Sequence, residues 1–152
     1  MQRARSARSG FTLIEIMAVV LIIGLLTGIV GIQIFQQVDK GRVAAAQTQM
    51  SSLAGVLELY RMDNGRFPST EQGLAALVQP PSIEPIPRNY QPGGYLPGGK
   101  VPLDPWGEPY QYAAPGQHNV HSFDLWSLGA DNAPGGEGVD QDIANWSEAE
   151  PS

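Results

Sequence analysis

Residues 10–38 read GFTLIEIMAVVLIIGLLTGIVGIQIFQQV, and this stretch decides the fold. Its part from residue 16 to residue 38 carries no charge over 23 positions and consists mostly of Ile, Leu, Val, Met, Phe and Ala. A bilayer core about 30 Å thick is spanned by about 20 apolar helical residues. The stretch therefore predicts either a transmembrane helix or a secretory signal.

The flanks favour a retained helix over a cleaved signal. An ordinary signal peptide has an apolar run of about 7–15 residues that leads directly to a small-x-small cleavage site. Here the run is longer, and the nearest such site, Ala44 to Ala46, follows the charged residues Asp39, Lys40 and Arg42. That site lies too far past the apolar run to be presented at the membrane surface, so we expect the helix to stay attached.

The charges around the apolar stretch predict its orientation. Three arginines precede it and two basic residues follow it: Arg3, Arg5, Arg8, Lys40 and Arg42. The flank of a membrane helix that carries more Lys and Arg tends to remain on the cytoplasmic side. We therefore expect a cytoplasmic N-terminus and an exported body.

Glu15 is an unusual residue for an apolar segment. A carboxylate at the centre of a membrane helix costs about 2.5–3.5 kcal/mol on insertion scales, so it normally has a partner or a function. Either Glu15 lies near the lipid headgroups or a partner or a function accounts for its position.

Beyond residue 38 the pattern becomes amphipathic. Apolar residues recur at intervals of four and three and form one helical stripe: Ala46, Met50, Leu53, Leu57 and Tyr60. The sequence Asp63-Asn64-Gly65 provides a C-terminal stop, so the helix should end near residue 63. A helix from Phe11 to that point is about 80 Å long at 1.5 Å per residue. Because a domain of this size is shorter, half of the helix should extend beyond it.

The rest of the chain predicts a small sheet with many loops. Ser69 or Thr70 can cap a short helix over residues 71–78. Residues 82–107 are rich in Pro and Gly and favour an irregular loop, with at most short strands near Tyr95 and Leu96. Residues 110–112 and 123–127 are the better strand candidates and should form an antiparallel sheet against the helix.

Composition excludes several classes of function. The chain has 152 residues, enough for one compact domain and one special segment. Six of its nine Lys and Arg residues lie outside the leader, against fifteen acidic residues, so nucleic-acid binding is disfavoured. It has no cysteine, which excludes disulfides and thiolate chemistry.

No residues predict catalysis. His121, Asp124 and Ser127 are the residue types of a hydrolytic triad, but they crowd into one short strand where alternation gives them no common pocket. His118 and His121 lack a third nitrogen ligand and are interpreted as surface residues.

An acidic loop near the C-terminus is the one candidate for binding chemistry. Four acidic residues fall within twelve positions and alternate with glycines: Asp131, Glu137, Asp140 and Asp142. No basic residue follows Lys100, so the loop has no internal counter-charge. Oxygen ligands of this kind suit Ca²⁺, although the spacing is not that of an EF-hand. From composition alone, a solvated acidic loop is the favoured interpretation.

The sequence GFTLIE at residues 10–15 resembles the prepilin cleavage signature of type IV pilins and type II secretion pseudopilins. The resemblance implies that a membrane peptidase cuts after Gly10 and that the new amine of Phe11 is methylated. It also implies that Glu15 pairs with the Phe11 amine of a neighbouring subunit. The chain would then divide into a cleaved basic leader (1–10), a transmembrane and assembly half-helix (11–38) and a soluble periplasmic domain (39–152).

Three further motifs narrow the resemblance to the major pseudopilins of type II secretion. They are DNGRFPSTEQGL at residues 63–74, DPWG at 104–107 and SLGAD at 127–131. The family implies an α+β, type IV pilin-like fold, in which a long N-terminal helix packs on a small antiparallel sheet beside a C-terminal calcium loop. The chain departs from the family at Ile32, where a proline is usual.

The family also implies a calcium ion as cofactor. Its ligands would come from the carboxylates of Asp131 and of Asp140 or Asp142, and from the carbonyls of Leu128 and Val139. Such an ion would be structural, because it would tie the C-terminal loop to the sheet.

The function implied by the resemblance is structural rather than enzymatic. The chain would polymerise into the periplasmic pseudopilus, a helical filament that helps drive exoproteins across the outer membrane. Its partners would be its own copies, minor pseudopilins, the prepilin peptidase and the inner-membrane assembly platform. A pilin of a surface type IV pilus and a periplasmic calcium-binding module that never polymerises are the alternatives.

Overall fold

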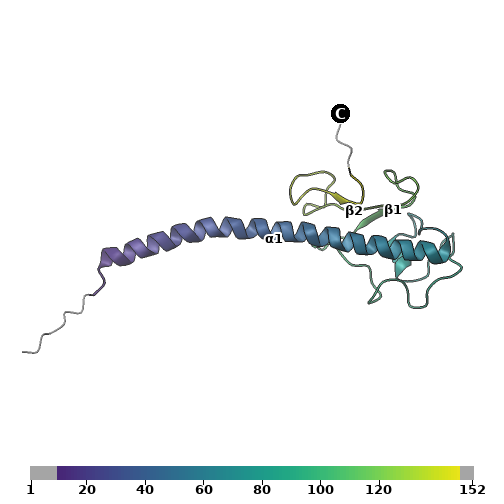
Figure 1. Cartoon of the computed structure of the whole chain (residues 1–152), viewed down its shortest axis with the longest axis horizontal. Helices are drawn as coiled ribbons and strands as arrows, with labels where there is room; N and C mark the ends of the chain where they lie inside the picture. Colours follow the sequence, from purple (N-terminus) through teal and green to yellow (C-terminus); the bar gives the residue numbers. More distant parts are fainter. Residues whose placement is uncertain (1–9, 148–152) are drawn as a thin grey trace, which may run out of the picture. The chain divides into compact units, whose positions relative to one another are not determined.

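The structure is a computed structural model that describes residues 10–147, with the side chains of residues 29–36 outside the described part. Its elements are α1 (Leu13–Asn64), the 3-10 helix η1 (Leu74–Leu77), and the strands β1 (Gln111–Ala113), β2 (Asp124–Ser127) and β3 (Ile143–Ala144) (Figure 1). The chain divides into two units, residues 1–38 and 39–152, with α1 passing from one to the other.

Helix α1 ends where the sequence predicts. The backbone N–H of Gly65 donates to the Arg61 carbonyl at 2.7 Å, and Gly65 has a φ of 75°. Glycine takes this left-handed conformation without a Cβ clash, which is why it ends helices. The helix is continuous through residue 32, which is isoleucine in this chain.

The first unit exposes its apolar side chains. Phe11 is 79% exposed, and Leu13, Ile14, Leu21 and Leu25 are similarly uncovered. Among the residues whose side chains the structure describes, no helix is long and apolar enough to cross a membrane. The predicted span over residues 16–38 includes side chains 29–36, which lie outside the described part, and it stays a prediction.

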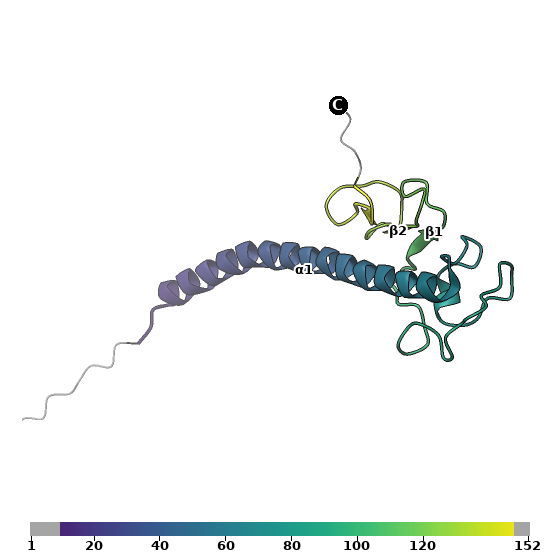
Figure 2. The same cartoon turned by 45° about the vertical axis from the view of Figure 1, so that its right-hand side comes forward.

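In the second unit, the predicted helical stripe forms one wall of the core. All five of its members are buried: Ala46, Met50, Leu53, Leu57 and Tyr60. They pack against Leu77 of η1 and against Tyr110, Leu125 and Ile143 from the region of the sheet. Figures 1 and 2 both show the strands lying alongside the C-terminal part of α1. The prediction of an amphipathic helix backing a small sheet is therefore confirmed.

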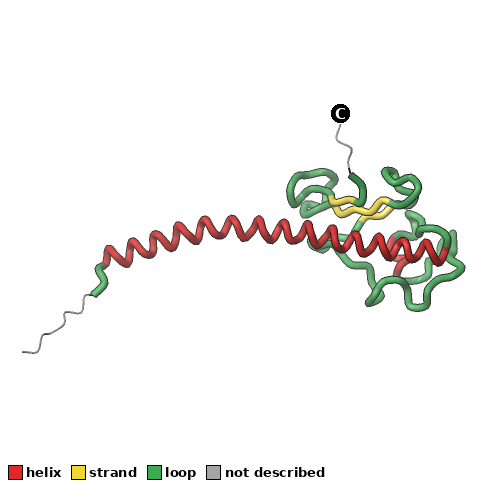
Figure 3. Tube along the Cα trace, viewed as in Figure 1, coloured by secondary structure: helices red, strands yellow, loops and turns green. Residues whose placement is uncertain are grey.

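The sheet has the antiparallel order β1-β2-β3. Tyr112 pairs with Leu125 across β1 and β2, and Ser127 pairs with Ile143 across β2 and β3. Both predicted strands are present within a residue of their expected bounds, while β3 was not predicted. Figure 3 shows how short the strands are beside the loops that connect them.

One prediction for the middle of the chain was wrong, and the irregular loop expected over residues 82–107 is present. The helix expected over residues 71–78 is reduced to the four residues of η1. It is preceded by a turn in which Ser69 Oγ accepts from the Gln72 N–H and Gln72 Oε1 accepts from the Ser69 N–H. Among the described residues no strand forms at Tyr95, whose N–H instead donates to the Leu77 carbonyl at 2.7 Å.

Candidate processing site and acidic loop

The start of α1 is built by a reciprocal cap between Thr12 and Glu15. The Glu15 N–H donates to Thr12 Oγ1 at 3.3 Å, and the Thr12 N–H donates to Glu15 Oε2 at 3.4 Å. This is the capping box of a Thr-x-x-Glu sequence, which satisfies two backbone donors at a helix terminus. The Thr-x-x-Glu pattern is visible in the sequence, but the apolar setting of Glu15 favoured a headgroup position or an assembly role over a cap.

Gly10, Phe11 and Thr12 precede the helix and take no regular secondary structure. Gly10 and Phe11 are exposed, and a Cβ added to Gly10 would meet no atom within 4 Å. The bond between Gly10 and Phe11 therefore lies in accessible chain outside the helix. Residues 1–9, which hold the rest of the predicted leader, lie outside the described residues.

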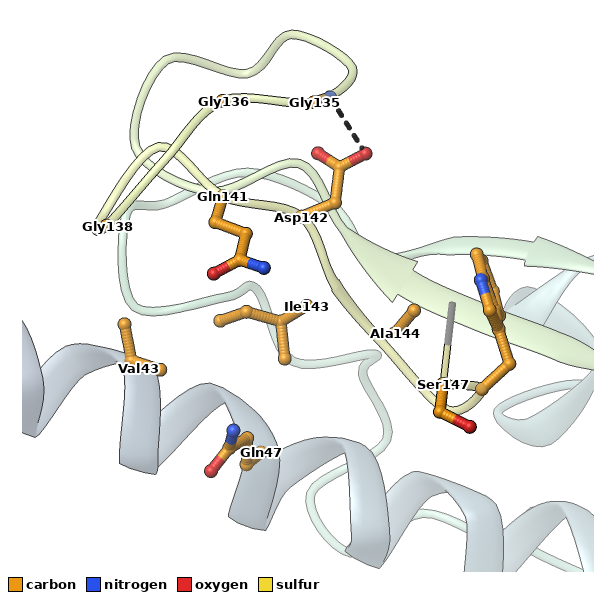
Figure 4. A pocket seen from close by; sticks show the side chains of 11 residues that line it. Val43, Gln47, Gly135, Gly136, Gly138, Gln141, Asp142, Ile143, Ala144 and Ser147 are labelled. Atoms are coloured by element: carbon orange, nitrogen blue, oxygen red, sulfur yellow. Dashed lines mark hydrogen bonds between the residues drawn. The ribbon is translucent and has the colours of Figure 1, made fainter. Parts of the chain in front are cut away.

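The acidic loop leaves and rejoins the sheet at one cross-strand pair. Ser127 is paired with Ile143, so residues 128 and 142 lie next to the last paired positions of β2 and β3. Two further contacts close the loop on itself. The Ala130 N–H donates to the Val139 carbonyl at 2.9 Å, and Asp142 and Gly135 exchange hydrogen bonds at 3.1 Å (Figure 4).

The loop packs so closely that only glycine fits at residue 129. Gly129 has a φ of 69°, and a Cβ there would lie 2.7 Å from the carbonyl carbon of Asp140. Such a contact is closer than real Cβ atoms tolerate. The backbone of residue 129 and that of residue 140 are thus held against each other.

The predicted calcium ligands all belong to this loop. Asp131 is exposed and accepts from the Ala133 N–H at 3.1 Å, while the Asp140 N–H donates to the Glu137 carbonyl at 3.2 Å. Leu128 is half-buried. Across residues 10–147, no three acidic or histidine side chains gather closely enough to hold a metal ion.

Asp142 differs from the other loop carboxylates. Its Oδ2 accepts from the Gly135 N–H, whereas Oδ1 is buried and has no hydrogen-bond partner among the described residues. A buried carboxylate oxygen without a partner is costly. Asp142 borders a pocket of about 440 Å³ between this loop and α1, lined also by Val43, Gln47 and Gln141 (Figure 4).

Sequence reasoning missed a polar centre at Asp124. This aspartate is 2% exposed and accepts the backbone N–H groups of Gln117, His118 and Asn119 at 2.7, 2.9 and 3.0 Å. Desolvation by burial raises the pKa of Asp124, but these hydrogen bonds together with that from the His118 ring outweigh it, and the net pKa is lowered.

His118 lies at the surface, as expected, but its side chain has two partners. Its Nδ1 lies 3.2 Å from Asp124 Oδ2, and its ring stacks on the indole of Trp146. Trp146 also meets Trp126 of β2 edge to face, so it covers part of the sheet. A histidine and a tryptophan so far apart in sequence give no local signal of their contact.

The fold and the first residues together define a class of protein. A long N-terminal helix preceded by Gly10-Phe11, whose C-terminal part backs a small antiparallel sheet, is the arrangement of pilin-like subunits. Residues 5–31 match the prokaryotic N-terminal methylation motif.

Residues 33–146 match the family described as type II secretion system, protein G, and the chain belongs to this family. It is 49% identical to the type II secretion system core protein G of Pseudomonas aeruginosa over 142 residues, which cover 93% of this chain and 97% of the relative. It is 43% identical to the core protein G of Vibrio cholerae, covering 91% of this chain and 92% of the relative.

A solved structure agrees with the family. The crystal structure of the major pseudopilin from the type 2 secretion system of enterohaemorrhagic Escherichia coli is similar, with a TM-score of 0.63 and 42% identity. The match covers 72% of this chain and 90% of that one. The expected pilin-like fold is confirmed, and the family supports the interpretation of a structural subunit rather than an enzyme.

Proposed function

We propose that this chain polymerises into the periplasmic pseudopilus of a type II secretion system and helps drive exoproteins across the outer membrane. The observation that carries the proposal is the methylation motif, which extends into the first half of a helix with uncovered apolar side chains. Such side chains are unfavourable in water and favour a lipid core or the same helix of other copies.

Processing at residues 10 and 11 prepares the subunit for assembly. A prepilin peptidase cuts the accessible bond after Gly10 and methylates the amine of Phe11. In the filament, Glu15 exchanges its bond with the Thr12 N–H for the Phe11 amine of a neighbouring copy. A new cation and a carboxylate in apolar surroundings each gain a partner in this way.

The proposed location is the bacterial inner membrane, crossed once by the segment 11–38. The domain formed by residues 39–152 then lies in the periplasm, which agrees with the basic leader on the cytoplasmic side. The proposed partners are copies of this chain, minor pseudopilins, the prepilin peptidase and the inner-membrane assembly platform.

The first test is the intact mass and N-terminal sequence of the chain purified from its native membrane. A chain that starts at methylated Phe11, and whose single-cysteine variants crosslink to other copies, supports the proposal. A Gly10→Leu variant serves as the control that blocks cleavage. A wild-type chain that retains Met1, or that never crosslinks to itself, overturns it in favour of an anchored module that does not polymerise.

A calcium ion in the acidic loop is proposed as the structural cofactor. The residues of the loop fit a calcium ion. Asp142 Oδ1 is a buried oxygen without a hydrogen-bond partner among the described residues, and the other predicted ligand atoms are carboxylate and carbonyl oxygens, which calcium prefers. Asp131, Asp140 or Asp142 and the carbonyls of Leu128 and Val139 would hold the ion. When bound, the ion would supply the positive charge that the acidic loop lacks.

A further inference from the structure

Besides Asp124, a second buried carboxylate lies outside the acidic loop, close to Ser127, where the loop leaves the sheet. Asp104, from the DPWG motif, is 5% exposed. Its Oδ1 accepts the backbone N–H groups of Trp106 and Glu108 at 3.0 and 2.9 Å, which fixes the tight turn of that motif. Its Oδ2 is therefore held in a set direction and is free to accept one more bond.

That bond comes from Ser127. The Ser127 hydroxyl donates to Asp104 Oδ2 at 2.6 Å and accepts from the Gly129 N–H at 3.3 Å. Ser127 is completely buried. Hydrogen bonds to carboxylates are stronger than those between neutral groups, so this short bond holds the hydroxyl firmly.

Ser127 is also the residue from which the acidic loop departs. It is paired with Ile143, so one proposed calcium ligand, Leu128, follows it directly and another, Asp142, precedes its cross-strand partner. The Gly129 N–H that reaches the Ser127 hydroxyl belongs to the peptide bond whose carbonyl is that of Leu128. The orientation of that peptide is thus set by Ser127, and that of Ser127 by Asp104.

We infer that Asp104 is a positioning residue for calcium in the acidic loop, acting through the Ser127 hydroxyl on the peptide between Leu128 and Gly129. The inference rests on the calcium proposal above. Asp104 itself does not touch the ion. Groups that orient metal ligands from behind typically change metal affinity by about 10–100-fold when they are removed.

The test is calorimetric titration of the full chain in detergent with calcium chloride after treatment with chelator. We expect Asp104→Asn and Ser127→Ala each to raise the Kd for calcium at least about tenfold. Because both act through one hydrogen bond, the double variant should bind no more weakly than the weaker single variant. Tyr112→Phe is the matched control, since it removes another hydroxyl bond, that from Tyr112 to the Pro68 carbonyl at 2.8 Å, away from the loop.

The outcomes are distinct. A wild-type affinity in both single variants overturns the inference while leaving the calcium proposal intact. Additive losses in the double variant also overturn it, because Asp104 would then act by its charge and not through Ser127. An equal loss of affinity in Tyr112→Phe would show a general effect of instability. A wild-type chain that binds no calcium overturns both proposals. If Asp104→Asn does not fold, Ser127→Ala against Tyr112→Phe decides alone.

Discussion

The imidazole of His118 lies flat on the indole of Trp146, with ring centroids 4.0 Å apart and planes inclined by 6°. The same imidazole reaches Asp124 Oδ2 through Nδ1. Trp146 follows β3 closely, so this stack fastens the segment after the acidic loop to the turn that Asp124 organises. Asn145 adds to the attachment, because its Oδ1 accepts the Leu125 N–H at 2.9 Å.

The stack should appear as a coupling energy between its two residues. Aromatic pairs contribute about 0.5–1.5 kcal/mol beyond the area they bury. We expect a coupling of this size between His118→Ala and Trp146→Ala in a double-mutant cycle of urea unfolding. His121→Ala, in the same loop and exposed like His118, is the control and should be additive with Trp146→Ala. A coupling near zero for His118 would contradict a stabilising stack.

Asp124 should make the free energy of unfolding depend on pH in the acid range. Its folded-state pKa is lowered, so its contribution is fully present above the ordinary value of 3.8 and is lost as the pH falls through the lower folded-state value. At neutral pH, Asp124→Asn should cost about 1.5–3 kcal/mol, the worth of hydrogen bonds to a charged group.

Urea unfolding of both proteins between pH 7 and pH 2.5 checks this expectation. The other carboxylates are common to both chains, so the difference in unfolding free energy isolates Asp124. That difference should shrink below a pH of about 4. A difference that stays constant over the whole range would rule out the hydrogen-bonded carboxylate as its source.

The close approach at Gly129 can be separated from its backbone conformation. Gly129 and Gly138 have nearly the same φ, 69° and 66°, but only at Gly129 would a Cβ meet other atoms. Gly138→Ala should cost about 1–2 kcal/mol for the left-handed conformation. Gly129→Ala should cost about 1–3 kcal/mol more, because the Asp140 backbone must move. The measurement is the unfolding free energy of both variants with chelator present. Equal losses would show that the Asp140 backbone moves away from a Cβ at residue 129 at no measurable cost.

Calcium removal should lower the melting temperature of the wild-type chain. A ligand at about 100 times its Kd adds about 2.7 kcal/mol to the stability of the folded state. Asp131→Ala should lose most of this calcium-dependent gain, and Glu137→Ala, a change of the same charge in the same loop, should keep it. An identical melting temperature with and without chelator would contradict the proposal that this domain binds a structural calcium ion.

The parts of the fold with a sequence period were predictable. The stripe from Ala46 to Tyr60 repeats over four turns and is buried throughout, and Gly65 ends the helix within a residue of the expected position. The strand β3 has two residues and no alternation, so its existence depends on pairing with Ser127 and Trp126. Periodicity cannot indicate an element that only tertiary contacts create.

The candidate sites divide in the same way. Gly10, Phe11 and Glu15 were found because their order is a contiguous motif. Asp104 was quoted only as part of DPWG, since nothing local shows that its carboxylate meets Ser127, 23 positions away. Polar groups that organise loops are identified by their partners, and those partners come from distant segments.

The two residues that separate the Gly10-Phe11 bond from α1 have a further consequence. The earliest backbone bonds of the helix run from the N–H groups of Glu15 and Ile16 to the Thr12 carbonyl. A cut between Gly10 and Phe11 therefore severs the chain without breaking any of these bonds or the Thr12 and Glu15 cap. The proposed cleavage would therefore leave the first turn of α1 as it is, with its backbone bonds and its cap already in place.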